Sequence, residues 1–139
     1  SCAEIYRVIE EVLPKDTYHW TLNPGHYTSA DEWTASPMYA GSETELKSGM
    51  MLQMDIIPSV AGYGGVSAED GVAIADEKLR NQIKEEYPET WKRINERREY
   101  MKNTLGINLK DEILPMSDIC GYLRPLILEH EYALKKDTV

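Results

Sequence analysis

Three side chains with metal-binding chemistry follow one another along this chain. His26 lies in the turn NPGH, Asp55 lies in the apolar run SGMMLQMDIIP, and Glu69 opens the run EDGVAIA. An imidazole combined with carboxylates suits Mn, Fe, Co or Zn better than Mg. The pattern predicts a metal site. The alternative is that His26 is a turn residue and Glu69 marks the solvent-exposed start of a strand.

Two of these residues belong to one predicted hairpin. Alternation in SGMMLQMDIIP indicates a strand with Asp55 in its middle, and EDGVAIA, residues 69–75, indicates a second strand. A reversal centred on Gly62 sets Asp55 directly opposite Glu69, whereas a later turn moves them out of register. Opposed like charges repel, so a cation between them would convert the conflict into a binding site.

Other segments are needed to support this hairpin. Apolar residues at helical spacing predict a helix from Cys2 to Leu13, and the loop that follows contains one strand candidate, YHWTL. Helix formers after Asp76 predict two helices divided by Pro88. Their charges alternate in sign, which favours a solvated surface over a binding patch. INLKDEILP and YLRPLILE suggest extended segments, the latter as an edge strand.

Length and charge narrow the class of protein. The 139 residues suit a single domain covering 1–139, and the formal charge of -9 disfavours nucleic acid as a partner. The sequence has no long apolar run and its two cysteines form no disulfide framework. We therefore expect a soluble cytoplasmic protein that does not bind membranes. Because the first residues already have helical spacing, we also expect a piece of a longer chain.

The motifs NPGHYTSADEW, LKSGMMLQMDIIP and SAEDGVAIAD, in this order, resemble the second half of the pita-bread metallohydrolases. This family includes creatinase, prolidase, Xaa-Pro aminopeptidase and methionine aminopeptidase. The resemblance covers residues 21–75 well and the rest loosely, with EILPMSDICGYLRP similar to the tail of creatinase-like members. It implies an α+β fold, with a curved antiparallel sheet and helices on one face, forming one half of the pita-bread fold.

The resemblance also implies roles for individual residues. His26 takes the place of a metal-binding histidine and Glu69 that of a glutamate that bridges two metals. Asp55 stands where the family has a glutamate that binds metal and acts as the general acid and base. Asp31 lies where a second, substrate-contacting histidine is expected, and Glu32 matches the glutamate beside it, so both are predicted to bind substrate.

The family's remaining ligands are two aspartates from the first half of its fold, which this chain does not contain. We therefore expect a divalent metal (Mn, Co, Fe or Zn) in the full-length protein, weak or no metal binding by this fragment, and no peptidase activity from it alone. The expected partners are a peptide substrate, the missing N-terminal half and a second copy of the chain. A dimer is expected because half of the fold leaves an apolar face uncovered.

Three functional hypotheses follow from these features. The first is the C-terminal part of a metal-dependent aminopeptidase or prolidase-like hydrolase acting on peptides. The second is a non-catalytic relative that binds a peptide or protein in the cleft where the family's enzymes bind substrate, which the changes at Asp31 and Asp55 would permit. The third is an acidic α+β domain in which His26 and Glu69 are structural.

Overall fold

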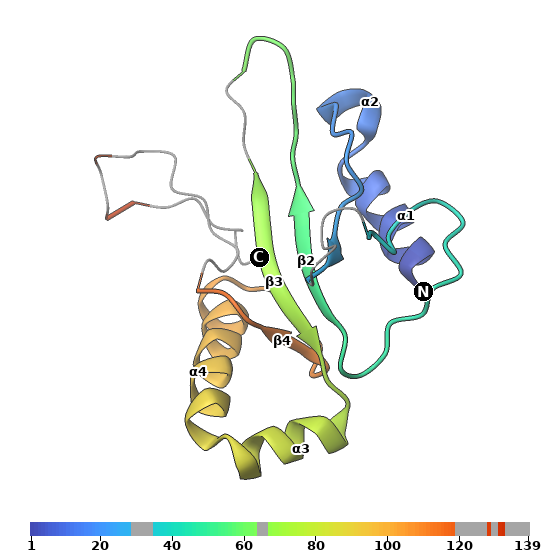
Figure 1. Ribbon diagram of the computed structural model, residues 1–139. Coiled ribbons are helices and arrows are strands. Elements are labelled where there is room, and N and C mark those ends of the chain that lie inside the picture. The colour runs from blue at the N-terminus through green and yellow to red at the C-terminus, as the bar shows by residue number, and fades with distance from the viewer. Residues whose placement is uncertain (29–34, 64–66, 119–127, 129–130, 133–139) are drawn as a thin grey trace.

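The computed structural model describes residues 1–28, 35–63, 67–118, 128, 131 and 132. Its strands form one four-stranded antiparallel sheet in the order β1-β2-β3-β4 (Figure 1). The strands are β1 (His26–Tyr27), β2 (Met51–Ile56), β3 (Ala68–Ile74) and β4 (Ile113–Pro115). The fold is therefore α+β with an antiparallel sheet, as the sequence predicts.

The hairpin of β2 and β3 is the longest paired part of the sheet. Its register sets Asp55 opposite Glu69, and Gly62 in the connection has a positive φ of 88°. Glycine adopts this backbone conformation without the penalty that a Cβ imposes. Both the predicted hairpin and the predicted pairing of the two carboxylates are confirmed.

The predicted first helix is confirmed as α1 (Cys2–Val12), which begins where the Ser1 side chain accepts a hydrogen bond from the Glu4 backbone N–H. This contact satisfies one of the free donors at the helix start. The inner side of α1 carries Cys2, which is completely buried in a cluster with the sheet residue Leu52. Burial of this apolar side joins α1 to the sheet.

The predicted strand YHWTL is wrong. Residues Lys15–Tyr18 form a short helix, α2, which ends at His19 with a left-handed φ of 52°. Trp20 follows, 2% exposed, and its indole Nε1 donates to the Leu13 carbonyl at 2.6 Å. The aromatic side chains that suggested a strand thus anchor a turn to the end of α1.

Two helices follow β3, as predicted: α3 (Glu77–Glu86) and α4 (Pro88–Glu99). Asp76 caps α3 by accepting from the Leu79 backbone N–H at 2.8 Å. Pro88 occupies the first turn of α4, where its missing N–H removes no helical hydrogen bond. A π-helical turn, η2 (Tyr100–Thr104), extends α4.

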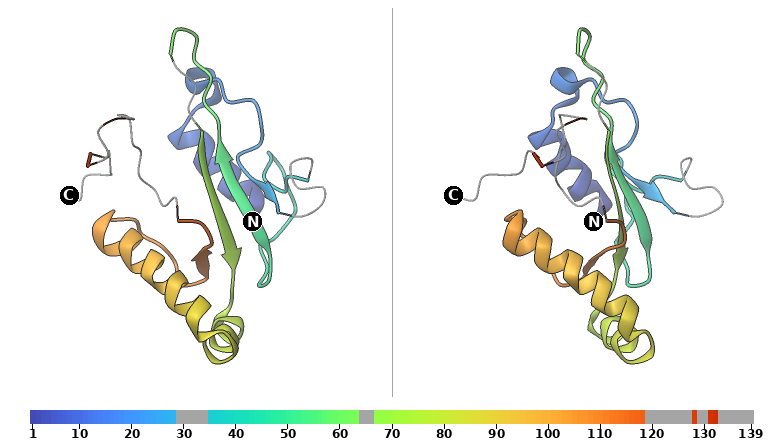
Figure 2. Two further views of the ribbon diagram at one scale, coloured as in Figure 1. Left: turned by 60° about the vertical axis from the view of Figure 1, so that its left-hand side comes forward. Right: turned by 90° about the vertical axis from the view of Figure 1, so that its left-hand side faces the viewer.

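The helices contact opposite faces of the sheet, so the expectation of helices on one face is wrong. The α1 cluster includes Leu52 and Ile74, whereas the α4 cluster includes Ala73 and Leu114, which are paired in the sheet register. Successive residues of a strand point to opposite faces. Figure 2 shows α1 alongside the β2–β3 ribbon and α3 and α4 at its lower end.

Two further predictions concern the C-terminal segment and membrane crossing. The predicted edge strand YLRPLILE, apart from Leu128, lies outside the described residues. In the part of the chain that the structure describes, no helix is long and apolar enough to cross a membrane.

Candidate functional site

His26 and Asp55 meet on the sheet face opposite α1. His26 of β1 pairs with Gln53 of β2, and Asp55 follows on the same face of β2 because strand side chains alternate. The distance from His26 Nε2 to Asp55 Oδ2 is 3.6 Å, with the side chains 10% and 12% exposed. The structure therefore brings together two of the three predicted metal ligands.

The turn before His26 depends on a glycine. A Cβ added at Gly25 would lie 3.0 Å from both the Gln53 carbonyl oxygen and the Met38 sulfur. A side chain at this position would push the turn away from β2. Ser36 holds the same turn by donating its hydroxyl to the Gly25 carbonyl. Close backbone approach at Gly25 thus sets the position of His26 against β2.

The two ring nitrogens of His26 have different surroundings. Nδ1 lies 3.0 Å from the Tyr27 carbonyl oxygen, which can only accept a hydrogen bond. A proton on Nδ1 satisfies this contact and leaves Nε2 to face Asp55. Histidines that bind metals usually donate one ring N–H to a carbonyl or carboxylate and use the other nitrogen as the ligand.

Asp55 lacks the partners that a buried carboxylate requires. Its Oδ1 is buried without a hydrogen-bond partner, while Oδ2 faces His26. Burial raises the pKa of the Asp55 carboxyl; the charge on His26 opposes this shift and the charge on Glu69 adds to it. Most buried polar atoms in native proteins are satisfied, so an unsatisfied one needs an explanation. A cation at Asp55 would supply the missing partner, and a proton would remove the charge.

Glu69 lies opposite Asp55 but turns toward a different neighbour. Its Oε2 accepts from the Gln53 amide at 2.8 Å, and its side chain is exposed. Within the described ranges, no three His, Cys, Asp or Glu side chains converge to hold a metal. Sequence reasoning missed Gln53, although its position two residues before Asp55 on the same strand face was the available signal.

A pocket of about 250 Å³ opens beside the two paired residues. Its lining combines His26 and Asp55 with Ser36 and the polar turn residues Thr21 and Asn23. The predicted substrate-binding residues Asp31 and Glu32 lie outside the described residues. The pocket therefore offers a partly polar space beside the His26–Asp55 pair.

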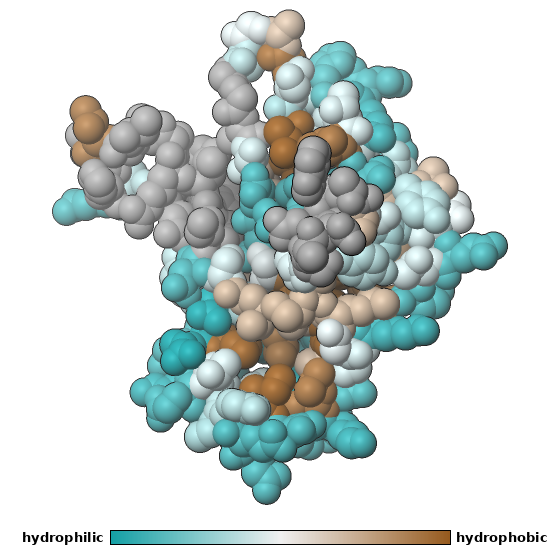
Figure 3. All heavy atoms as spheres, in the orientation of Figure 1, coloured by the Kyte–Doolittle hydropathy of each residue, from teal (hydrophilic) through white to brown (hydrophobic). Residues whose placement is uncertain are grey.

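An apolar groove of about 280 Å³ lies farther along the same sheet face. Met51 and Ala73 of the sheet form one wall, and Ile83 and Ile94 of α3 and α4 form the other. Figure 3 shows hydrophobic atoms gathered here between polar rims. Met51 and Asp55 share a face of β2, so the groove and the polar pocket lie on one surface.

Comparisons of the chain with protein-family models, curated proteins and solved structures find no match. Function is therefore inferred from the chemistry of the site. The donor set fits a divalent transition metal in part, because His26 and Asp55 are placed to share a cation and Glu69 is one strand away.

Proposed function

We propose that this chain is the C-terminal part of a metal-dependent aminopeptidase or prolidase-like hydrolase that acts on peptides. The observation that carries the proposal is the Asp55 carboxylate, whose Oδ2 lies 3.6 Å from His26 Nε2 and whose buried Oδ1 has no hydrogen-bond partner. The resemblance of the motifs around these residues to the pita-bread metallohydrolases supports the same assignment. The fragment alone is proposed to be inactive.

His26 and Asp55 would hold the metal, joined by Glu69 after its carboxylate leaves the Gln53 amide. The metal, when bound, supplies Lewis-acid polarisation of a peptide carbonyl. Asp55 is suited to accept and return a proton because burial raises the pKa of its carboxyl. The remaining ligands would come from the N-terminal half of the complete protein.

The decisive experiment uses two lengths of the protein. The 139-residue chain and a version extended by its upstream segment are assayed with Mn²⁺ or Co²⁺ on Xaa-Pro dipeptides. We expect hydrolysis only from the extended version, and a loss of about 100-fold or more in Asp55→Asn. His26→Ala should weaken Mn²⁺ binding measured by calorimetry.

Two outcomes would contradict the proposal. The first is an extended protein that takes up Mn²⁺ through His26 and yet cleaves no peptide. The second is Mn²⁺ binding that His26→Ala leaves unchanged. Glu43→Gln, an exposed loop substitution, is the control for a general loss of negative charge.

A second candidate function is non-catalytic peptide binding, favoured by the apolar groove on the sheet face that carries Asp55. In this case the extended protein binds the same peptides without cleaving them. Substituting Ile83→Gln in the groove would weaken this binding, whereas His26→Ala would not. The hydrolase candidate therefore predicts a loss of function in His26→Ala, and the peptide-binding candidate predicts it in Ile83→Gln.

A further inference from the structure

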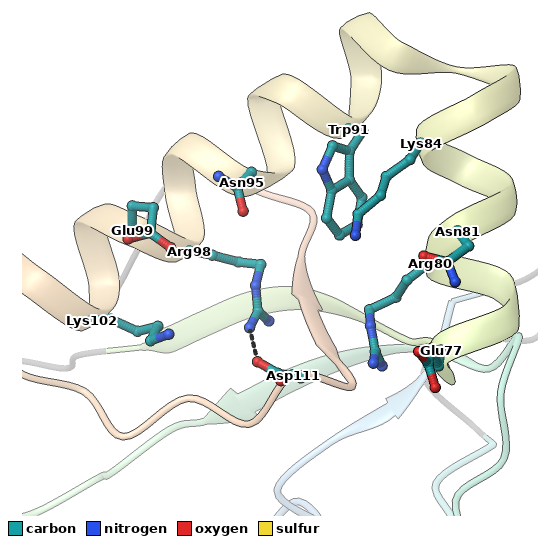
Figure 4. A pocket seen from close by; sticks show the side chains of 10 residues that line it. All are labelled: Glu77, Arg80, Asn81, Lys84, Trp91, Asn95, Arg98, Glu99, Lys102 and Asp111. Atoms are coloured by element: carbon teal, nitrogen blue, oxygen red, sulfur yellow. Dashed lines mark hydrogen bonds and ion pairs between the residues drawn. The ribbon is translucent and has the colours of Figure 1, made fainter.

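A second polar pocket, separate from the His26 site, lies between α3 and α4. Its volume is about 270 Å³, and Figure 4 shows cationic side chains from both helices reaching into it. The cationic residues of the lining are Arg80, Lys84, Arg98 and Lys102. This concentration is unusual in a chain whose formal charge is -9.

Arg98 forms the fixed base of this pocket. It is 5% exposed, and one nitrogen, Nη1, donates to the carbonyls of Ile113 and of Lys110, the latter at 3.0 Å. Its Nη2 pairs with the Asp111 carboxylate at 3.1 Å. The guanidinium is therefore held in one orientation, and the negative charge of Asp111 is already compensated.

Two further cations are held by neighbouring groups. Arg80 donates one nitrogen to the Ala75 carbonyl at 2.7 Å. Lys84 places its Nζ 4.8 Å from the centre of the Trp91 ring. Cations whose side chains are already ordered lose less conformational entropy when an anion binds. The pocket is therefore partly preorganised for a negative ligand.

The remaining lining adds neutral donors and two carboxylates. Asn81 and Asn95 contribute amides, while Glu77 and Glu99 contribute negative charge. Glu99 accepts a hydrogen bond from the Asn103 amide at 2.8 Å. Once the Arg98–Asp111 pair is set aside, three cations face two carboxylates, which leaves a local excess of positive charge.

We propose that this pocket binds a small phosphate-bearing anion, either inorganic phosphate or a phosphomonoester. Arginine offers paired N–H groups that match phosphate oxygens, and lysine adds a compact charge. The polar lining is unsuited to an apolar ligand. The site shares no residue with the His26 pocket, so it is independent of the proposed hydrolase function.

The proposal is tested by calorimetric titration of the full chain with inorganic phosphate and with glycerol 1-phosphate, at constant ionic strength. Arg80→Gln removes the charge and keeps a polar side chain, and we expect it to weaken binding about tenfold. Lys102→Gln should weaken it about threefold to fivefold. Lys47→Gln removes the same charge outside α3 and α4 and should have no effect.

Saturable binding that follows this order supports the proposal, and the tighter of the two ligands identifies the source of the phosphate. Absence of saturable binding to either ligand overturns it, as does equal weakening by Lys47→Gln, which would indicate nonspecific attraction. Circular dichroism of each variant shows whether the fold is retained. If Arg80→Gln unfolds, Lys102→Gln alone decides the outcome.

Discussion

Arg98 is a buried charged residue and Asp55 a largely buried one, its side chain 12% exposed, but their surroundings differ sharply. Arg98 donates to two carbonyls and to the carboxylate of Asp111. Asp55 has His26 at 3.6 Å on one oxygen and no partner on the other. The fold itself provides the partners of Arg98, whereas it provides none for one oxygen of Asp55.

This difference separates two uses of a buried charge. A satisfied charge holds segments together, and its removal leaves its former partners without hydrogen bonds. An unsatisfied charge costs stability and persists where it serves binding or chemistry. We therefore assign Arg98 to the support of its pocket, and this contrast is the reason that Asp55 is placed in the proposed metal site.

The largest expected effect comes from removing the satisfied charge. Arg98→Ala should lower the free energy of unfolding by about 2 to 4 kcal/mol, because it removes a buried side chain and leaves the Lys110 and Ile113 carbonyls without their charged donor. Urea denaturation measures the change. Arg93→Ala on the exposed side of α4 is the matched control, with an expected change within about 0.5 kcal/mol. Equal effects of the two would remove the structural role assigned to Arg98.

The next effect concerns the turn that positions His26. Gly25→Ala should destabilise the protein by about 1 to 3 kcal/mol, because its Cβ would crowd the Gln53 carbonyl and the Met38 sulfur. Gly71→Ala is the matched glycine control, since its nearest contact would be an ordinary 3.8 Å to Met116. The thermal midpoint of each variant gives the comparison. An unchanged midpoint in Gly25→Ala would show that β1 can move without cost.

Removing the unsatisfied charge should have the opposite sign. Asp55→Asn is expected to stabilise the metal-free protein by about 1 kcal/mol at pH 7. The folded-state pKa of Asp55 lies above its unfolded value of about 3.9, so ionisation penalises the folded state at higher pH. The gain should disappear as the pH falls below about 4. Urea titrations at both pH values in EDTA test this, and a pH-independent change would contradict the charge argument.

The smallest effect on stability is expected for Gln53→Ala. The hydrogen bond from its side-chain amide to Glu69 is exposed, so the loss in free energy of unfolding should stay within about 0.5 kcal/mol. The same change releases the Glu69 carboxylate and should strengthen Mn²⁺ binding by the extended protein. The control is Gln82→Ala, which loses an exposed hydrogen bond from its amide to Glu86 on α3. Calorimetry of the two variants isolates the effect of freeing Glu69 on Mn²⁺ binding. Weaker Mn²⁺ binding in Gln53→Ala would exclude Glu69 as a ligand.

Local sequence patterns predicted the helices and strands better than they predicted which distant segments contact one another. Alternation around Asp55 and the glycine at position 62 predicted the register that faces Glu69. The pairing of His26 with β2 could not be predicted, because a two-residue strand carries no periodic signal and depends on Gly25 fitting against a distant segment. Arg98 was expected on a solvated face, yet unpaired carbonyls of the 110–113 segment draw it into the interior.

The sheet order has a consequence for how the protein folds. Each of the four strands that the structure describes pairs with its neighbour in sequence, so this part of the sheet forms without a crossover connection. The β2–β3 hairpin has the most local pairing, and we expect it in the folding transition state, with β1 added later. Gly25→Ala should then speed unfolding more than it slows refolding in stopped-flow measurements, and the reverse result would place β1 in the nucleus. Asp55 would thus be fixed in the hairpin before His26 arrives beside it.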